Sequence, residues 1–107
     1  MNFSAFSIRN PIPAIMLFAL DAKGAFTLSE GRALESLGFK PGELAGRSAF
    51  DFFRQAPMAR VNIRRALSGE KFTATVELEG QAFETYYSPV FRDYDEVAGV
   101  IGVAINV

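Results

Sequence analysis

The 107-residue chain contains no cysteine and no histidine. Without cysteine it has no disulfides, no thiolate nucleophile, no Cys-ligated zinc or iron–sulfur cluster, and no chromophore held through a cysteine adduct. Without histidine it lacks the usual general base near neutral pH and the usual nitrogen ligand for metals and haem. Ser-His-Asp and Cys-His catalytic sites are therefore excluded, and these absences argue against an enzyme.

Long apolar runs and a strong net charge are missing as well. No run approaches the roughly 20 apolar residues that cross a bilayer, and the first residues do not have the basic-then-apolar pattern of a secretory signal. Eleven Lys and Arg against twelve Asp and Glu give a net charge of −1, whereas a dedicated nucleic-acid-binding domain is normally strongly basic. We therefore expect a cytoplasmic domain that contacts neither nucleic acid nor membrane.

Apolar and aromatic side chains are abundant. Half of the residues are hydrophobic, and 11 of the aromatic side chains are Phe. A chain of this length makes one domain, and this composition favours a packed core over disorder. Residues 14–20 (AIMLFAL) form a short apolar run between Pro13 and a turn, which predicts a strand. Residues 25–29 are its expected hairpin partner, with Phe26 and Leu28 on one face.

The middle of the chain predicts short helices, at residues 29–38, 48–53 and 57–67. Ser29 and Ser48 are the expected N-caps, and Gly38 is the expected C-terminal stop. Pro57 fits the first position of the last helix. Four arginines in or near this helix form a basic cluster, which either docks an acidic partner or anionic ligand or, as is more common, is a solvated helix face: Arg54, Arg60, Arg64 and Arg65.

The last third predicts strands. Residues 72–79 and 83–87 alternate apolar with polar side chains, and a two-residue turn at Gly80 and Gln81 joins them. Residues 97–107 are apolar on both faces, as is typical of a central strand. Three glutamates alternate with apolar residues in this region and are expected to face water: Glu77, Glu79 and Glu84.

Short motifs occur in a fixed order along these elements. They are SEGRAL at residues 29–34, LG at 37–38, GELAGRS at 42–48, DFF at 51–53, RALSGE at 65–70, YSPV at 87–90 and GVIGVA at 99–104. No single motif is specific, but the ordered set resembles a PAS domain over residues 13–107, preceded by a leader at residues 1–12. The resemblance implies an α+β fold, with a five-stranded antiparallel sheet in the order 2-1-5-4-3 and the helices packed on one face.

The resemblance also implies a pocket between the inner face of the sheet and the helices. Its candidate walls are Phe18, Phe26, Leu34, Phe50, Phe53, Val61, Val76, Phe83 and Tyr87. These side chains either hold a small apolar or flat ligand, such as a fatty acid or another uncharged metabolite, or simply fill the core. The composition excludes His-ligated haem and Cys-adduct flavin, and nothing in the sequence specifies a non-covalent flavin.

A second candidate surface is the outer face of the sheet. If Phe18 points inward, its neighbours Ile15, Leu17 and Ala19 point outward and form an apolar patch, which usually marks an interface. The leader carries three further apolar residues that could cover this patch, in cis or from a second copy: Phe3, Phe6 and Ile8. We therefore expect a homodimer through the outer face and the leader, as in many PAS domains.

The function implied by the resemblance is that of a non-catalytic sensory module in bacterial-type signal transduction, such as a two-component system. It would regulate an attached histidine kinase or diguanylate cyclase. The chain ends in Ile105-Asn106-Val107 where the family often continues with Asp-Ile-Thr toward an output domain, so we expect a fragment. One alternative is a purely structural homodimerisation domain with a filled core. A remote alternative is a small cone-shaped isomerase that uses a buried carboxylate such as Asp51 as base.

Overall fold

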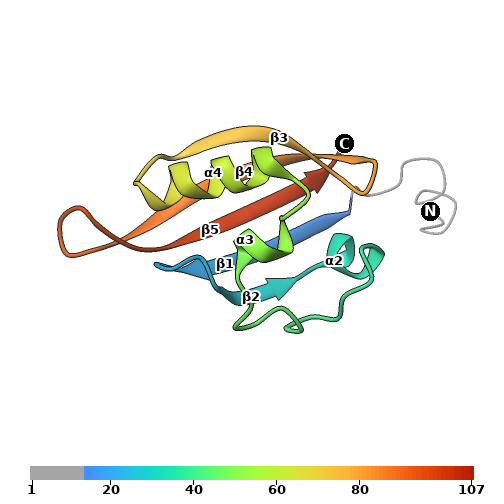
Figure 1. Cartoon of the computed structure of the whole chain (residues 1–107), viewed down its shortest axis with the longest axis horizontal. Coiled ribbons are helices and arrows are strands. Elements are labelled where there is room, and N and C mark those ends of the chain that lie inside the picture. The colour runs from blue at the N-terminus through green and yellow to red at the C-terminus, as the bar shows by residue number, and fades with distance from the viewer. Residues whose placement is uncertain (1–13) are drawn as a thin grey trace, which may run out of the picture.

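Five strands form one antiparallel sheet in the order β2-β1-β5-β4-β3 in the computed structural model, which describes residues 14–107 (Figure 1). The strands are β1 Ile15–Asp21, β2 Phe26–Glu30, β3 Phe72–Leu78, β4 Gln81–Arg92 and β5 Glu96–Asn106. The helices between β2 and β3 are α2 Arg32–Ser36, α3 Ala49–Phe52 and α4 Pro57–Leu67. This is the sheet order implied by the resemblance to PAS domains. The leader residues Phe3, Phe6 and Ile8 lie outside the described residues.

The helices cover one face of the sheet (Figure 1). Helix α2 contacts β1, whereas α4 lies across β3, β4 and β5. Strand β5 is central because β1 and β4 pair with its two sides. Its apolar side chains on both faces follow from that position.

Glycine and serine set the helix ends largely as the sequence predicts. Gly38 has a φ of 93°, and the N–H groups of Gly38 and Phe39 donate to the carbonyls of Glu35 and Leu34. This pair of bonds is a Schellman motif, which ends α2 and fixes the position of Phe39. Ser48 caps α3 because its Oγ accepts from the N–H of Phe50 at 3.2 Å.

The predicted cap at Ser29 is wrong, because Ser29 lies within β2, which also contains a bulge. Leu20 pairs with Phe26 and Ala19 pairs with Leu28, so Thr27 has no partner on β1. The extra residue reverses the alternation, and the side chains that point into the core are those of Phe26 and Ser29 rather than Phe26 and Leu28. Gly31 is the N-cap of α2, and no side chain caps this helix.

The turn between β3 and β4 lies one residue earlier than predicted. Leu78 pairs with Gln81, so Glu79 and Gly80 form the two-residue turn, with φ values of 50° and 74°. Two positive φ angles are typical of a type I′ hairpin turn, which favours Asn, Asp or Gly at these positions. Glu79 therefore belongs to the turn and not to β3, but its side chain is exposed, as predicted.

Strand β4 is longer than the predicted segment at residues 83–87. It continues through Pro89 to Arg92 and pairs with β5 along its length. The ladder with β3 ends at the pair between Phe72 and Tyr87. Beyond Tyr87, β4 is therefore an edge strand on that side, where proline is tolerated.

The core lies between the sheet and the helices and is rich in aromatic rings. Phe18 packs edge-on against Phe26 and Tyr87, with ring centroids 6.2 and 6.4 Å apart. The Phe18 ring also lies over Gly102 of β5, where any Cβ would collide with it. Gly102 thus allows a large ring from β1 to fill the centre of the inner face.

Candidate functional site

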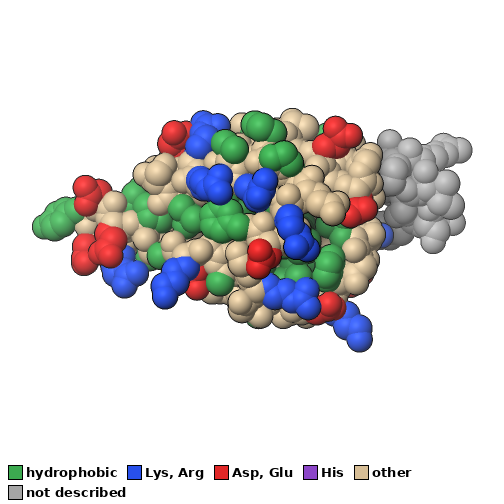
Figure 2. Space-filling view, viewed as in Figure 1, with side chains coloured by type: hydrophobic (Ala, Val, Ile, Leu, Met, Phe, Trp, Pro, Cys, Tyr) green, Lys and Arg blue, Asp and Glu red, His purple; other side chains and the backbone are tan. Residues whose placement is uncertain are grey.

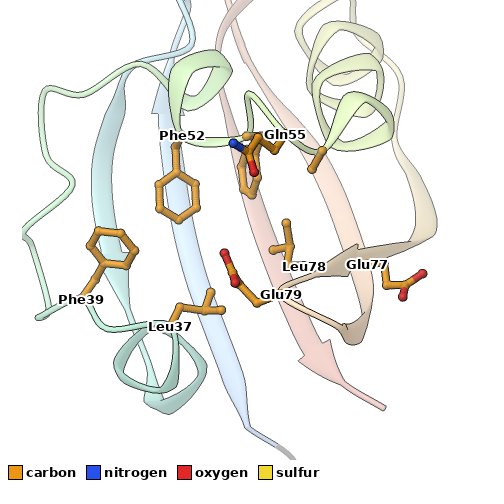
Figure 3. A pocket seen from close by; sticks show the side chains of 9 residues that line it. Leu37, Phe39, Phe52, Gln55, Glu77, Leu78 and Glu79 are labelled. Carbon is orange, nitrogen blue, oxygen red and sulfur yellow. The ribbon is translucent and has the colours of Figure 1, made fainter.

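A cleft of about 320 Å³ opens beside β3, between the end of α2, helix α3 and the turn that joins β3 to β4 (Figure 3). We call it the edge cleft. Its lining combines apolar and aromatic side chains with three exposed polar ones, and consists of Leu37, Phe39, Phe52, Phe53, Gln55, Ala56, Glu77, Leu78 and Glu79. Among the predicted pocket residues, Phe53 lies in this lining.

Phenylalanines from two elements form one wall of the edge cleft. The rings of Phe39 and Phe52 meet edge to face, with centroids 5.2 Å apart, and Phe52 packs against Phe53 at 4.8 Å. The Schellman motif after α2 positions Phe39. The Ser48 cap fixes the start of α3, which carries Phe52 in its last position and Phe53 as its C-cap. Leu78 of β3 faces this wall from the opposite side (Figure 3).

Two polar side chains point toward the interior of the edge cleft from opposite sides. Figure 3 shows the carboxylate of Glu79 reaching up from the turn and the amide of Gln55 reaching down from the segment between α3 and α4. The side chain of Glu77 points away from it. Within residues 14–107 the one ion pair joins Arg65 to Glu70, at 2.7 Å, so no cation of this part of the chain neutralises Glu79.

The position of Glu79 is the feature of this cleft that the sequence did not predict. Alternation predicted an exposed residue at the end of a strand. Glu79 is exposed, but it lies in a left-handed turn and its carboxylate points toward the cleft. The glycine at position 80 signals the turn, but it does not fix which two residues occupy it. The one-residue difference decides whether this carboxylate belongs to the cleft.

A second cleft of about 350 Å³ continues along the same edge, between the start of α4 and β3. It shares Gln55, Ala56 and Glu77 with the edge cleft and reaches Met58 and Val76. The two clefts together follow the gap between the helical segment and β3.

Most of the predicted pocket residues are packed in the core and line neither cleft. Five side chains are no more than 3% exposed: Phe18, Phe26, Leu34, Phe83 and Tyr87. Val76 is buried and lines the second cleft. Phe50 is half-buried beside the turn at Gly24, under the guanidinium of Arg64 at 5.4 Å.

The placement of Val61 in the pocket wall is wrong. Its side chain is 41% exposed, because it lies on the side of α4 that faces solvent, whereas Asn62, Ile63 and Ala66 face the sheet. The suggestion of Asp51 as a buried base also fails, since Asp51 is exposed in the first turn of α3.

The interior contains polar side chains that the sequence analysis did not single out. Asn62, Thr85 and Ser29 are no more than 3% exposed. Burial raises the pKa of the Tyr87 phenol, while hydrogen bonding with Asn62 and Thr85 lowers it in part. The Oγ of Ser29 is buried without a hydrogen-bond partner, as is the Nε of Arg60.

The described residues give no support for a flat cofactor or a metal. Phe18, Phe26 and Tyr87 occupy the centre of the interior, and the ring of Phe18 lies directly on Gly102, so these side chains do not fit a flavin or haem there. Residues 14–107 contain no cluster of three or more His, Cys, Asp or Glu that could hold a metal ion. No helix in this part of the chain is long and apolar enough to cross a bilayer.

The outer face of the sheet carries exposed apolar side chains. Ile15 and Leu17 of β1 are 40% and 37% exposed, Ala19 is half-buried, and Ile101 of β5 is 45% exposed. Leu17 pairs with Val103, which pairs in turn with Tyr86 of β4, so the patch crosses neighbouring strands. The outward direction predicted for the β1 residues is confirmed.

A family model described as the PAS fold matches residues 11–107. The chain belongs to the PAS family. The comparison with curated protein sequences finds no match.

Solved structures share the fold of this PAS domain. A domain of a histidine kinase from Haloarcula marismortui, described as light and redox sensing, aligns with a TM-score of 0.70 and 15% identity, over 99% of each chain. A domain of an HTR-like protein from Haloarcula marismortui ATCC 43049 aligns with a TM-score of 0.67 and 16% identity, over 87% of this chain and 97% of the other. The LOV protein of Rhodobacter sphaeroides aligns with a TM-score of 0.64 and 18% identity, over 100% of this chain and 69% of the other. At these identities the likeness establishes the fold.

Proposed function

We propose that this PAS domain is a non-catalytic, cytoplasmic sensory module that forms a homodimer through its outer face and regulates an attached output domain, such as a histidine kinase or a cyclase. The observation that carries the proposal is the apolar patch of Ile15, Leu17 and Ile101 on a sheet whose other face is covered by helices. Apolar patches of this kind on small soluble domains mark interaction sites.

The mechanism follows from the position of the interface on the central strands. A ligand or partner that binds one arrangement of the dimer more tightly than another shifts the population toward it. Strand β5 lies in the middle of the sheet and contributes Ile101 to the outer face. A change in packing there reaches the C-terminal end of the same strand, where an output domain would continue.

The proposal is tested by the oligomeric state of the full chain and of matched apolar-to-Glu variants. Sedimentation velocity is expected to show a dimer for the wild type and a monomer for Leu17→Glu, because a charge in the patch opposes its burial. Met58→Glu is the control, since Met58 is 62% exposed on α4, away from the outer face. Ile101→Glu repeats the test on a second strand, and circular dichroism checks that each variant is folded.

A monomeric wild type, or a Leu17→Glu variant that remains dimeric while folded, would contradict the outer-face dimer. Deletion of residues 1–12 tests the leader separately and is expected to weaken the dimer. Unchanged association and solubility after this deletion would remove the leader from the proposal.

A second candidate function is a purely structural dimerisation domain, which the filled interior favours. Native mass spectrometry, repeated after denaturation, distinguishes the two. A mass excess that disappears on denaturation supports a ligand-binding sensor, whereas a bare dimer supports the structural function.

A further inference from the structure

We propose that the edge cleft binds a small organic cation, an ammonium group carried on an apolar body. This inference deepens the proposed sensory role by naming a ligand class. The effect of the ligand on signalling rests on the proposed function, whereas the binding of the ligand to the edge cleft does not.

The size and walls of the edge cleft suit the apolar body of such a ligand. A volume of about 320 Å³ is at the lower end of the roughly 300–1,000 Å³ of small-molecule sites. Leu37, Leu78 and the rings of Phe39 and Phe52 supply apolar surface on both sides (Figure 3). Covering these side chains removes apolar surface from water and favours binding.

The charge of the edge cleft selects a cation. Glu79 directs a carboxylate into it without a cationic partner among residues 14–107, and Gln55 offers an amide oxygen from the opposite side. The lining contains no Lys or Arg, so an anionic ligand would meet Glu79 with no compensating charge. A neutral apolar ligand would leave the exposed carboxylate of Glu79 without a charge partner, and any water that it displaced from this group would cost free energy.

Aromatic rings strengthen the same preference. An ammonium group is attracted to the electron-rich face of a phenyl ring, and a carboxylate adds a charge-assisted hydrogen bond. In the edge cleft both kinds of group are present, with Phe39 and Phe52 on one wall and Glu79 beside them. The combination recognises a primary ammonium better than any uncharged group of the same size.

The test uses isotope-labelled full chain and three probes with the same phenyl body. 2-Phenylethylammonium is the cationic probe, 2-phenylethanol is the neutral control, and 3-phenylpropionate is the anionic control. Titration followed by nuclear magnetic resonance is expected to shift the side-chain amide of Gln55 and the backbone amides of Glu79 and Phe52. The cationic probe should bind at least about tenfold more tightly than either control, a difference of about 1.4 kcal/mol.

Two matched variants locate the charge that matters. Glu79→Gln keeps the length of the side chain and the backbone of the turn and removes the charge. It is expected to lower the affinity for the cationic probe about tenfold. Glu96→Gln makes the same change on an exposed side chain of β5 that does not line the edge cleft, and it should leave the affinity unchanged.

Equal binding of all three probes, equal loss in both variants, or no binding of the cation at its solubility limit would overturn the inference. The oligomeric state is measured on the same samples by sedimentation velocity. If the cation binds and the chain is monomeric, the result supports the edge cleft and contradicts the dimer-based sensor. If the chain is dimeric and the cation does not bind, the result supports the dimer and contradicts the edge cleft.

Discussion

At the scale of single residues, Tyr87 makes stability depend on alkaline pH. Burial raises the pKa of its phenol above the ordinary value, so the folded state holds this proton more tightly than the unfolded state. Below the unfolded pKa of about 10 the phenol is neutral in both states, and its full contribution is present. As the pH rises from there through the folded pKa, that contribution is lost.

Tyr87→Phe is expected to flatten this alkaline decline. At pH 8 the variant should be less stable by about 1 kcal/mol, because Asn62 loses a hydrogen-bonding partner. The difference from the wild type should narrow above pH 10. Urea denaturation at both pH values measures it, with Tyr94→Phe as control because Tyr94 is 98% exposed. Parallel pH curves for wild type and Tyr87→Phe would contradict the prediction.

The buried hydroxyl of Ser29 leads to a comparison of two serine-to-alanine substitutions. We expect the change to stabilise the protein at position 29 and to destabilise it at position 48. Ser29→Ala removes an Oγ that has no partner, and we expect it to raise the free energy of unfolding by about 1 kcal/mol. Ser48→Ala removes a helix cap and should lower it by about 1 kcal/mol. Urea unfolding of both variants provides the comparison. A loss of stability in Ser29→Ala would contradict the prediction and show that the Oγ of Ser29 is satisfied in the folded protein.

At the scale of elements, the packing of β1 against β5 depends on a glycine, Gly102, which leaves room for the ring of Phe18. A Cβ on Gly102 would collide with the ring of Phe18, so Gly102→Ala is expected to cost about 1–3 kcal/mol. Phe18→Leu replaces the ring with a smaller side chain, so in the double variant it should recover part of the stability that Gly102→Ala loses. Thermal unfolding of the two single variants and the double variant measures the coupling.

Gly99 provides the matched control for this coupling. A Cβ there would collide with the backbone carbonyl of Leu20, which no side-chain substitution relieves. Phe18→Leu should therefore leave the cost of Gly99→Ala unchanged. Additive effects of Gly102→Ala and Phe18→Leu would show that the ring does not restrict position 102.

The elements differ in how far the sequence could predict them. Helix α4 was predicted at its observed bounds because Pro57 fits its first turn and Gly69 follows its last. Strand β3 was predicted nearly as well from its alternation. The bulge at Thr27 left no comparable signal, because an unpaired residue depends on the partner strand and not on its own side chain.

At the scale of the whole molecule, β4 connects the two candidate sites. The turn at its start carries Glu79, its inner face contributes Phe83 and Tyr87 to the core, and Tyr86 faces outward beside the apolar patch. It pairs with β5 from Phe83 to Arg92. A displacement of the turn on ligand binding would therefore act on the strand that borders the proposed dimer interface.

The layers of the molecule were predictable from the sequence, but the edge cleft was not. Residues 14–20 are all apolar, so the inward direction of Phe18 came from the resemblance to PAS domains, and the period of two then placed Leu17 on the outer face, as the structure shows. The cleft instead depends on the register of one turn and on where Phe39 lies after α2. The first is set by the pairing of β3 with β4, and the second by the capping hydrogen bonds at the end of α2, and neither can be read from the type of a single residue.

The left-handed backbone at Glu79 places the residue under two opposing selective pressures. A left-handed residue with a side chain costs of the order of 1 kcal/mol that glycine largely avoids. Selection for stability alone would thus favour glycine at position 79, whereas selection for cation binding would retain the carboxylate. Among homologous chains with this turn, the identity of the residue here would separate those that use the edge cleft from those that have lost it.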